Sequence, residues 1–145
     1  MRIDWIDRQD QPIDGRFVRR VAQAAAREAG APAGTVSIAL LDDERITELN
    51  RSHRGLDGPT DVLAYEGDAE DPTYLGDVVI SVETAARQAA EAGRPLLHEV
   101  AWLAAHGVLH LLGFDDVDDA ERALMIERQD RALAACVPAR GRQSP

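Results

Sequence analysis

The order of helix and strand signals along this chain predicts an α+β fold, in which one mixed sheet of about four strands carries about five helices. Short runs of β-branched and apolar residues alternate with longer segments in which apolar residues recur every three or four positions. No linker, repeat or low-complexity segment divides the sequence. We therefore expect a single layered domain over residues 1–137, followed by a disordered tail over 138–145.

The first half of the chain supplies two strands and two helices. The expected elements are a strand over 2–6, a helix over 12–29, a strand over 36–41 and a helix over 44–51. Gly30 and Pro32 end the first helix, because glycine favours the position after a helix and proline cannot continue one. Asp42 or Asp43 is placed to cap the second helix, since a carboxylate there accepts from free backbone N–H groups.

The second half supplies the other two strands and three helices. The expected elements are a loop over 52–60, a strand over 62–65, an acidic loop over 66–73, a strand over 76–81 and helices over 83–92, 95–112 and 118–135. Gly93 and Pro95 separate the first two of these helices. Gly113 ends the long central helix, and Asp118 caps the last one.

Composition and charge exclude several classes of protein. The formal net charge is −10, which argues against nucleic-acid binding by bulk electrostatics. All 16 basic residues are Arg, however, and a few well-placed guanidinium groups can still bind phosphate. No apolar run reaches the roughly 20 residues that a membrane span needs. The N-terminus lacks the pattern of a signal peptide, and Cys136 has no second Cys to pair with, so we expect a cytoplasmic protein without membrane contact.

The segment from His106 to Asp116 carries the strongest functional signal. It reads His-Gly-Val-Leu-His-Leu-Leu-Gly-Phe-Asp-Asp. His106 and His110 lie four residues apart in a predicted helix, so both imidazoles share one face, about 6 Å apart along the axis. This spacing suits two ligands of one metal ion. Gly113 then ends the helix, which allows Asp115 or Asp116 to supply a third ligand.

Three protein ligands leave one coordination position open, as in catalytic zinc sites. A metal bound there would lower the pKa of a water molecule and so provide a nucleophile near neutral pH. The alternative is that the two His are half-buried packing residues, but the glycine turn and the acid after it favour the metal site. Gly107 stands where the zincin signature has its general-base Glu, which disfavours a zincin-type peptidase.

Two further blocks accompany this motif in the order found in a known family. Residues 49–65 read Leu-Asn-Arg-Ser-His-Arg-Gly-Leu-Asp-Gly-Pro-Thr-Asp-Val-Leu-Ala-Tyr, and residues 75–81 read Leu-Gly-Asp-Val-Val-Ile-Ser. Together with residues 106–116, they resemble the three signatures of the bacterial YbeY family. The first of these blocks is similar to a family signature in which an Asn leads to an Arg and then to Pro-Thr-Asp-Val-Leu. The resemblance covers about residues 35–135.

The resemblance implies a metal-dependent, single-strand-preferring endoribonuclease that acts in 16S rRNA maturation and ribosome quality control. It implies that Arg54 binds the phosphate and that His106 and His110 bind the metal. The family has a His as its last ligand, whereas this chain has Asp116. Because a carboxylate also binds zinc, at about 2.0–2.2 Å, we expect Asp116 to complete the site. We expect one Zn²⁺ per chain, with other divalent metals accepted because the third ligand is Asp.

Two other functions remain open at this stage. One is a non-catalytic ribosome-assembly factor that keeps the fold, and the other is a metallohydrolase with a small or peptide substrate. Ribosomal RNA is the expected partner, with basic ribosomal proteins as a second class that the acidic surface would suit. Asp61 and Asp77 are interpreted as structural residues at strand borders, and His53 as a solvated loop residue.

Overall fold

Four strands form one mixed sheet in the order β1-β2-β4-β3. They are β1 (Arg2–Asp7), β2 (Thr35–Leu41), β3 (Val62–Glu66) and β4 (Tyr74–Ser81). β1, β2 and β4 run parallel, whereas β3 pairs antiparallel with β4 and forms one edge of the sheet. The structure is a computed structural model that describes residues 1–30 and 33–138, and it confirms the predicted α+β class and the mixed sheet.

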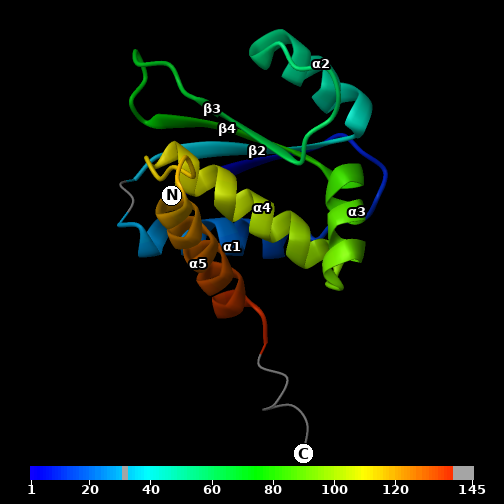
Figure 1. Cartoon of the computed structure of the whole chain (residues 1–145). Coiled ribbons are helices and arrows are strands. Elements are labelled where there is room, and N and C mark those ends of the chain that lie inside the picture. The colour runs from blue at the N-terminus through cyan, green and yellow to red at the C-terminus, as the bar shows by residue number, and fades with distance from the viewer. Residues whose placement is uncertain (31–32, 139–145) are drawn as a thin grey trace, which may run out of the picture.

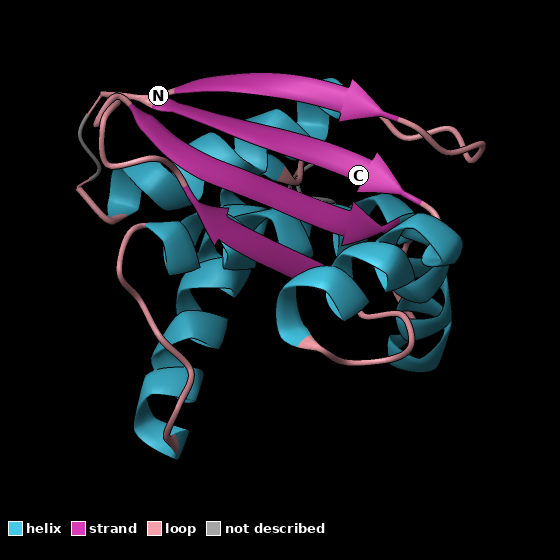
Figure 2. Cartoon of the chain, turned by 90° about the horizontal axis from the view of Figure 1, so that it is seen from above, coloured by secondary structure: helices cyan, strands magenta, loops and turns pink. Residues whose placement is uncertain are grey.

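Helices cover the two faces of the sheet unequally. Within the described residues they are α1 (Gly15–Glu28), α2 (Asp43–Arg54), α3 (Val82–Ala92), α4 (Leu96–Leu111) and α5 (Asp119–Cys136). Figure 1 shows α1, α4 and α5 on one side of the sheet and α2 on the other. Figure 2 looks down on the α2 side, where that helix covers only one end of the strands. We call these faces the helical side and the α2 side.

The main core lies between the sheet and the helical side. Its fully buried members come from both layers and include Val36, Ile38, Leu40, Val78 and Ile80 of the strands and Val18, Val21, Val100, Ala104 and Val108 of the helices. α4 is the centre of this layer, because it contacts α1, α3 and α5 as well as β3 and β4. The functional motif at the end of α4 is therefore anchored by the best-packed part of the molecule.

Gly107 allows α4 to pack unusually close to β4. A Cβ built at this position would lie 2.5 and 2.8 Å from the two Cγ atoms of Val78, which real Cβ atoms essentially never do. Val78 is itself fully buried, so it has little room to move. A Glu after His106, as the zincin signature requires, would therefore collide with the sheet.

The α2 side has a small apolar cluster and a polar junction. The cluster consists of Leu41, Ile46, Leu63 and Val79. At the junction, Asp43 accepts hydrogen bonds from the hydroxyls of Ser81, at 2.6 Å, and Thr84, at 2.7 Å. Arg87 pairs with the other Asp43 carboxylate oxygen at 2.9 Å. Burial acts to raise the pKa of Asp43, but these hydrogen bonds outweigh it and hold the pKa below its ordinary value.

Several expected boundaries shift in the structure. The prediction of a loop from Ser52 was wrong, because α2 continues to Arg54 and ends at Gly55, whose φ of 67° is left-handed. Of the two expected capping residues, Asp42 and Asp43, it is Asp42 that caps this helix, because its carboxylate accepts from the Arg45 N–H. Most of the expected disordered tail, residues 139–145, lies outside the described part of the chain. No helix in the described part is long and apolar enough to cross a membrane.

Candidate functional site

The end of α4 presents both His of the motif to one cavity. His106 and His110 lie one turn apart on the helix, as their spacing predicts. Gly113 follows the helix with a φ of 100° and donates from its N–H to the His110 carbonyl at 3.1 Å. The Phe114 N–H donates to the Leu109 carbonyl at 3.0 Å, which completes a Schellman motif. This turn reverses the chain, so that the acids after it come back towards α4.

Asp116, and not Asp115, lines the cavity. Asp116 Oδ2 lies 3.8 Å from His106 Nε2. Asp115 instead accepts a hydrogen bond from the Asp116 backbone N–H at 2.9 Å. Arg122 orders the same turn, because its guanidinium donates to the Asp116 carbonyl at 3.4 Å and pairs with Asp119 at 3.1 Å. The turn thus directs Asp116 inward and leaves Asp115 exposed.

The other nitrogen of His106 contacts a buried glutamine of α5. His106 Nδ1 lies 3.2 Å from Oε1 of Gln129. The Gln129 Nε2 donates to the Trp102 carbonyl at 3.1 Å. A second link between α4 and α5 is the hydrogen bond from the Trp102 indole N–H to Asp130, at 2.8 Å. These contacts fix the His106 ring between the two helices, while its Nε2 faces the cavity.

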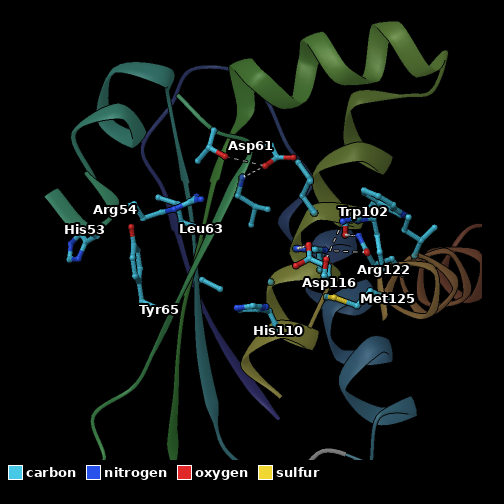
Figure 3. A pocket seen from close by; sticks show the side chains of 18 residues that line it. His53, Arg54, Asp61, Leu63, Tyr65, Trp102, His110, Asp116, Arg122 and Met125 are labelled. Carbon is cyan, nitrogen blue, oxygen red and sulfur yellow. Dashed lines mark hydrogen bonds and ion pairs between the residues drawn. The ribbon is translucent and has the colours of Figure 1, made fainter. Parts of the chain in front are cut away.

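The cavity has a volume of about 770 Å³ and passes around the edge strand β3. Its walls come from the end of α2, from β3, from α4 and from α5, and include Arg54, Tyr65, His106, His110, Asp116 and Gln129. We call it the β3 cavity. Figure 3 shows Arg54, His53 and Tyr65 on one side, and His110, Asp116 and Arg122 on the other. Residues from separate segments of the sequence therefore face each other across β3.

The wall on the α2 side combines a cation with two rings. His53 and Tyr65 contact each other with ring centroids 4.7 Å apart and a tilt of 46°. Burial raises the pKa of Tyr65, while the nearby Arg54 guanidinium acts in the opposite direction. Arg54 is exposed and has no ion-pair partner among the residues that the structure describes. The last turn of α2 thus offers a guanidinium that pairs with no carboxylate in the described part of the chain, next to aromatic surface.

Asp61 and Asp77 make the structural hydrogen bonds that were expected of them. Asp61 lines the β3 cavity, but its carboxylate accepts from the Val62 N–H at 2.7 Å and from Gln88 at 3.3 Å. Asp77 lies on the α2 side of β4 and accepts from the Tyr74 hydroxyl. These contacts agree with the structural roles expected for the two acids. His53, which was expected in a loop, lies instead in the last turn of α2.

The types of side chain at the end of α4 suit a divalent cation. Two imidazoles and one carboxylate on an accessible wall form a ligand combination that several divalent metals accept. The contact of His106 Nδ1 with Gln129 also resembles the support that metal-binding His usually receives from its second nitrogen. Within residues 1–30 and 33–138, no group of three or more His, Cys, Asp or Glu side chains is close enough to hold a metal as the side chains stand. The metal assignment accordingly stays a prediction.

Sequence reasoning gave no role to several polar or aromatic residues of the cavity wall, among them Tyr65, Trp102, Arg122 and Gln129. Only Gln129 has a signal that could have revealed it. It occupies the buried stripe of α5, four residues after Met125 and three before Ala132, where the pattern calls for an apolar side chain. A buried amide at such a position requires hydrogen-bond partners, and it therefore marks a polar contact inside the core.

Comparison with known proteins identifies the family. A sequence model of the family described as Endoribonuclease YbeY matches residues 6–137. The chain belongs to the YbeY family. Endoribonuclease YbeY of Moorella thermoacetica is 48% identical over 140 residues, which cover 86% of this chain and 90% of the relative. The corresponding protein of Geobacillus kaustophilus is 42% identical over 148 residues, covering 92% and 95%.

The YbeY match extends beyond the three signatures. It begins in β1 and ends after α5, so the family shares nearly the whole described fold. The solution structure of a Thermotoga maritima protein has a TM-score of 0.65 and covers 92% of this chain and 88% of its own, at 23% identity. A similarity at that level of identity shows the fold alone. The sheet and the helical layer around the YbeY motif are therefore not peculiar to this chain.

Proposed function

We propose that this YbeY-family chain is a metal-dependent endoribonuclease that hydrolyses phosphodiesters in single-stranded RNA. We place its activity in the cytoplasm, in 16S rRNA maturation and ribosome quality control. The observation that most supports the proposal is the arrangement of the β3 cavity. His106 lines it, and His110 and Asp116 lie across from Arg54 (Figure 3). The relatives from Moorella thermoacetica and Geobacillus kaustophilus are both named as endoribonucleases, which supports the same reaction.

Each wall of the cavity has a separate chemical task in this proposal. A divalent cation, when bound, would supply a Lewis acid for the phosphate and lower the pKa of a water molecule. His106, His110 and Asp116 would hold that cation. The Arg54 guanidinium would donate to the non-bridging phosphate oxygens and stabilise the charge that grows on them in the transition state. Arg122 would keep Asp116 directed inward through the contacts already made by its guanidinium.

The charge of the protein and the shape of the site favour single-stranded RNA. A net charge of −10 disfavours the binding of a duplex by bulk electrostatic attraction to its phosphates. Unpaired bases, by contrast, can stack on aromatic side chains, and the His53–Tyr65 pair offers such a surface beside Arg54. Binding would then depend on few phosphate contacts, so it should weaken only modestly with added salt. The acidic surface itself suits a basic ribosomal protein as partner.

Replacing Arg54 by Ala tests the phosphate-binding role. We expect RNA cleavage to fall by about 100-fold or more, because a charge-stabilising donor is lost, while the metal content per chain stays unchanged. Arg51→Ala is the matched control, because Arg51 lies three residues earlier in α2, pairs with Asp57 at 2.6 Å and does not line the cavity. Full activity of Arg54→Ala in a gel-based RNA cleavage assay would remove this residue from the mechanism.

Replacing the third ligand tests the metal assignment. Asp116→His should favour zinc more strongly over harder metals, since imidazole is the softer ligand. It should also move the rise of the cleavage rate to lower pH, because the site loses one negative charge. His110→Ala should lose both metal and activity. Elemental analysis and pH–rate profiles measure these effects. If the unmodified chain and Asp116→His had the same metal selectivity and the same pH profile, the assignment of Asp116 as a ligand would be contradicted.

The same measurements separate the competing functions. Bound metal without RNA cleavage would indicate a metallohydrolase with another substrate. A chain with neither metal nor cleavage would be a non-catalytic ribosome-assembly factor that keeps the YbeY fold.

A further inference from the structure

We propose that Gln129 is a positioning residue, which holds the His106 ring in the tautomer with the proton on Nδ1 and leaves Nε2 as the free nitrogen in the β3 cavity. The use of that nitrogen as a metal ligand rests on the proposed function, whereas the tautomer itself does not. The inference starts from the contacts of Gln129, whose side chain is 1% exposed and lies between α4 and α5.

The orientation of the Gln129 amide follows from its partner on α4. The Trp102 backbone carbonyl can only accept a hydrogen bond, so the Gln129 NH₂ group must face it, at 3.1 Å. The amide oxygen of Gln129 is thereby turned towards His106 Nδ1, at 3.2 Å. If the amide flipped, the Gln129 oxygen would face the Trp102 carbonyl oxygen. Two acceptors would then oppose each other, and the hydrogen bond to Trp102 would be lost.

The tautomer of His106 follows from the orientation of the amide. Neutral imidazole has one N–H donor and one acceptor nitrogen, and the amide oxygen of Gln129 can only accept. Nδ1 must therefore carry the proton, since otherwise two lone pairs would face each other in a buried place. Nε2 keeps its lone pair and points to the cavity, where the Asp116 carboxylate lies 3.8 Å away. Only an unprotonated imidazole nitrogen can bind a metal ion.

Packing alone does not require an amide at position 129. The neighbours of Gln129 on the buried stripe of α5 are Met125 and Ala132, which are both apolar. A methionine has nearly the length of glutamine and would fill the same space without a polar group. The cost of burying an unsatisfied amide is avoided here because both ends of the amide are paired. The observed pairing gives Gln129 a directional role that an apolar residue would lack.

Two variants separate the acceptor from the rest of the side chain. Gln129→Met removes both the acceptor for His106 and the donor for the Trp102 carbonyl. Gln129→Glu gives up the same donor but keeps an acceptor oxygen for Nδ1. Any loss of stability from the broken Trp102 hydrogen bond should therefore appear in both variants, whereas an effect on His106 should appear only in Gln129→Met.

The tautomer is measured on the metal-free chain by long-range ¹H–¹⁵N NMR of the His106 ring at alkaline pH. We expect a proton on Nδ1 in the unmodified chain and in Gln129→Glu, and a shift towards the proton on Nε2 in Gln129→Met. An Nε2–H form in the unmodified chain would overturn the inference, and so would an Nδ1–H form that persists in Gln129→Met. If Gln129→Met does not fold, the spectra of the unmodified chain and of Gln129→Glu still decide.

Zinc affinity, measured by competition with a chromophoric chelator, tests the consequence. Gln129→Met should bind zinc about 10–100-fold more weakly, and Gln129→Glu should bind it as well as the unmodified chain or better. Equal affinities of all three proteins would overturn the positioning role. If the unmodified chain binds no divalent metal, the proposed function fails at that point, while the NMR spectra still determine whether Gln129 sets the His106 tautomer.

Discussion

The two faces of the sheet differ in how they are held and in what they contribute to the site. On the helical side, α4 is buried among three other helices and two strands, and it carries His106 and His110. On the α2 side, one helix rests on a four-residue apolar cluster and a polar junction, and its last turn carries Arg54. The β3 cavity lies where the two faces meet at the sheet edge.

This difference suggests a division between a fixed and a more adaptable wall. Ligands of a metal ion must be held at defined positions, and a densely packed helix does so. A phosphate-binding Arg on a thinly packed helix can adjust to the substrate, because less apolar contact holds the helix in place. The two walls should accordingly respond to mutation in different ways.

Truncation of a core leucine on each face should give the largest effects. Leu109→Ala removes a fully buried side chain of α4 and should destabilise the chain by about 2–5 kcal/mol. Leu63→Ala removes a side chain of the small cluster that also borders the cavity, so the site can relax and the loss should be about 2 kcal/mol. Urea unfolding measures both free energies, and a larger loss for Leu63 would reverse the comparison.

Adding one methyl group at Gly107 should be the next largest effect. The new Cβ would clash with Val78, so Gly107→Ala should destabilise the chain by about 1–3 kcal/mol despite the better helix propensity of Ala. The double variant Gly107→Ala/Val78→Ala gives the control, since it removes the colliding methyl groups. If the clash is the cause, the double variant loses less stability than the sum of the single variants. Additive losses in urea unfolding would point to another cause.

Loss of the polar junction on the α2 side should have a smaller effect. Asp43→Asn weakens the hydrogen bonds from Ser81, Thr84 and Arg87, which should destabilise the chain by about 1–2 kcal/mol at neutral pH. The pKa of Asp43 is lower in the folded chain than its ordinary value, so its ionised form stabilises the fold above that ordinary value.

The pH dependence of this effect has a definite sign. As the pH falls through the lowered folded pKa of Asp43, its carboxylate becomes protonated and its contribution to stability disappears. The difference in unfolding free energy between the unmodified chain and Asp43→Asn should therefore shrink in acid. Urea unfolding from neutral to acid pH measures it, and a difference that is constant with pH would contradict the role of the ionised carboxylate.

Arg54→Ala should have the smallest effect on stability, although its effect on RNA cleavage is expected to be large. Arg54 is exposed and makes no ion pair among the described residues, so the unfolding free energy should change by less than about 0.5 kcal/mol. Thermal unfolding of the same sample that is used for the cleavage assay provides the measurement. A marked loss of stability would mean that Arg54 supports the fold, and the loss of cleavage would then have another explanation.

The sequence alone determined the features that depend on local spacing. The strand and helix order was predictable because apolar periodicity distinguishes the two. The shared face of His106 and His110 was predictable because four residues make about one helical turn, and the turn at Gly113 because glycine readily adopts a left-handed backbone. The resemblance to the family signatures predicted a phosphate-binding role for Arg54.

Tertiary structure alone decided which distant segments meet. Nothing local indicates that α2 lies by itself on one face of the sheet, that Arg54 lines the same cavity as the His pair, or that Gln129 contacts His106 from 23 residues away. Those relations depend on how α4 and α5 pack against the sheet, and packing is a property of the whole set of side chains. Local periodicity indicates which face of a helix or strand is apolar, but it does not indicate which other helix or strand covers that face.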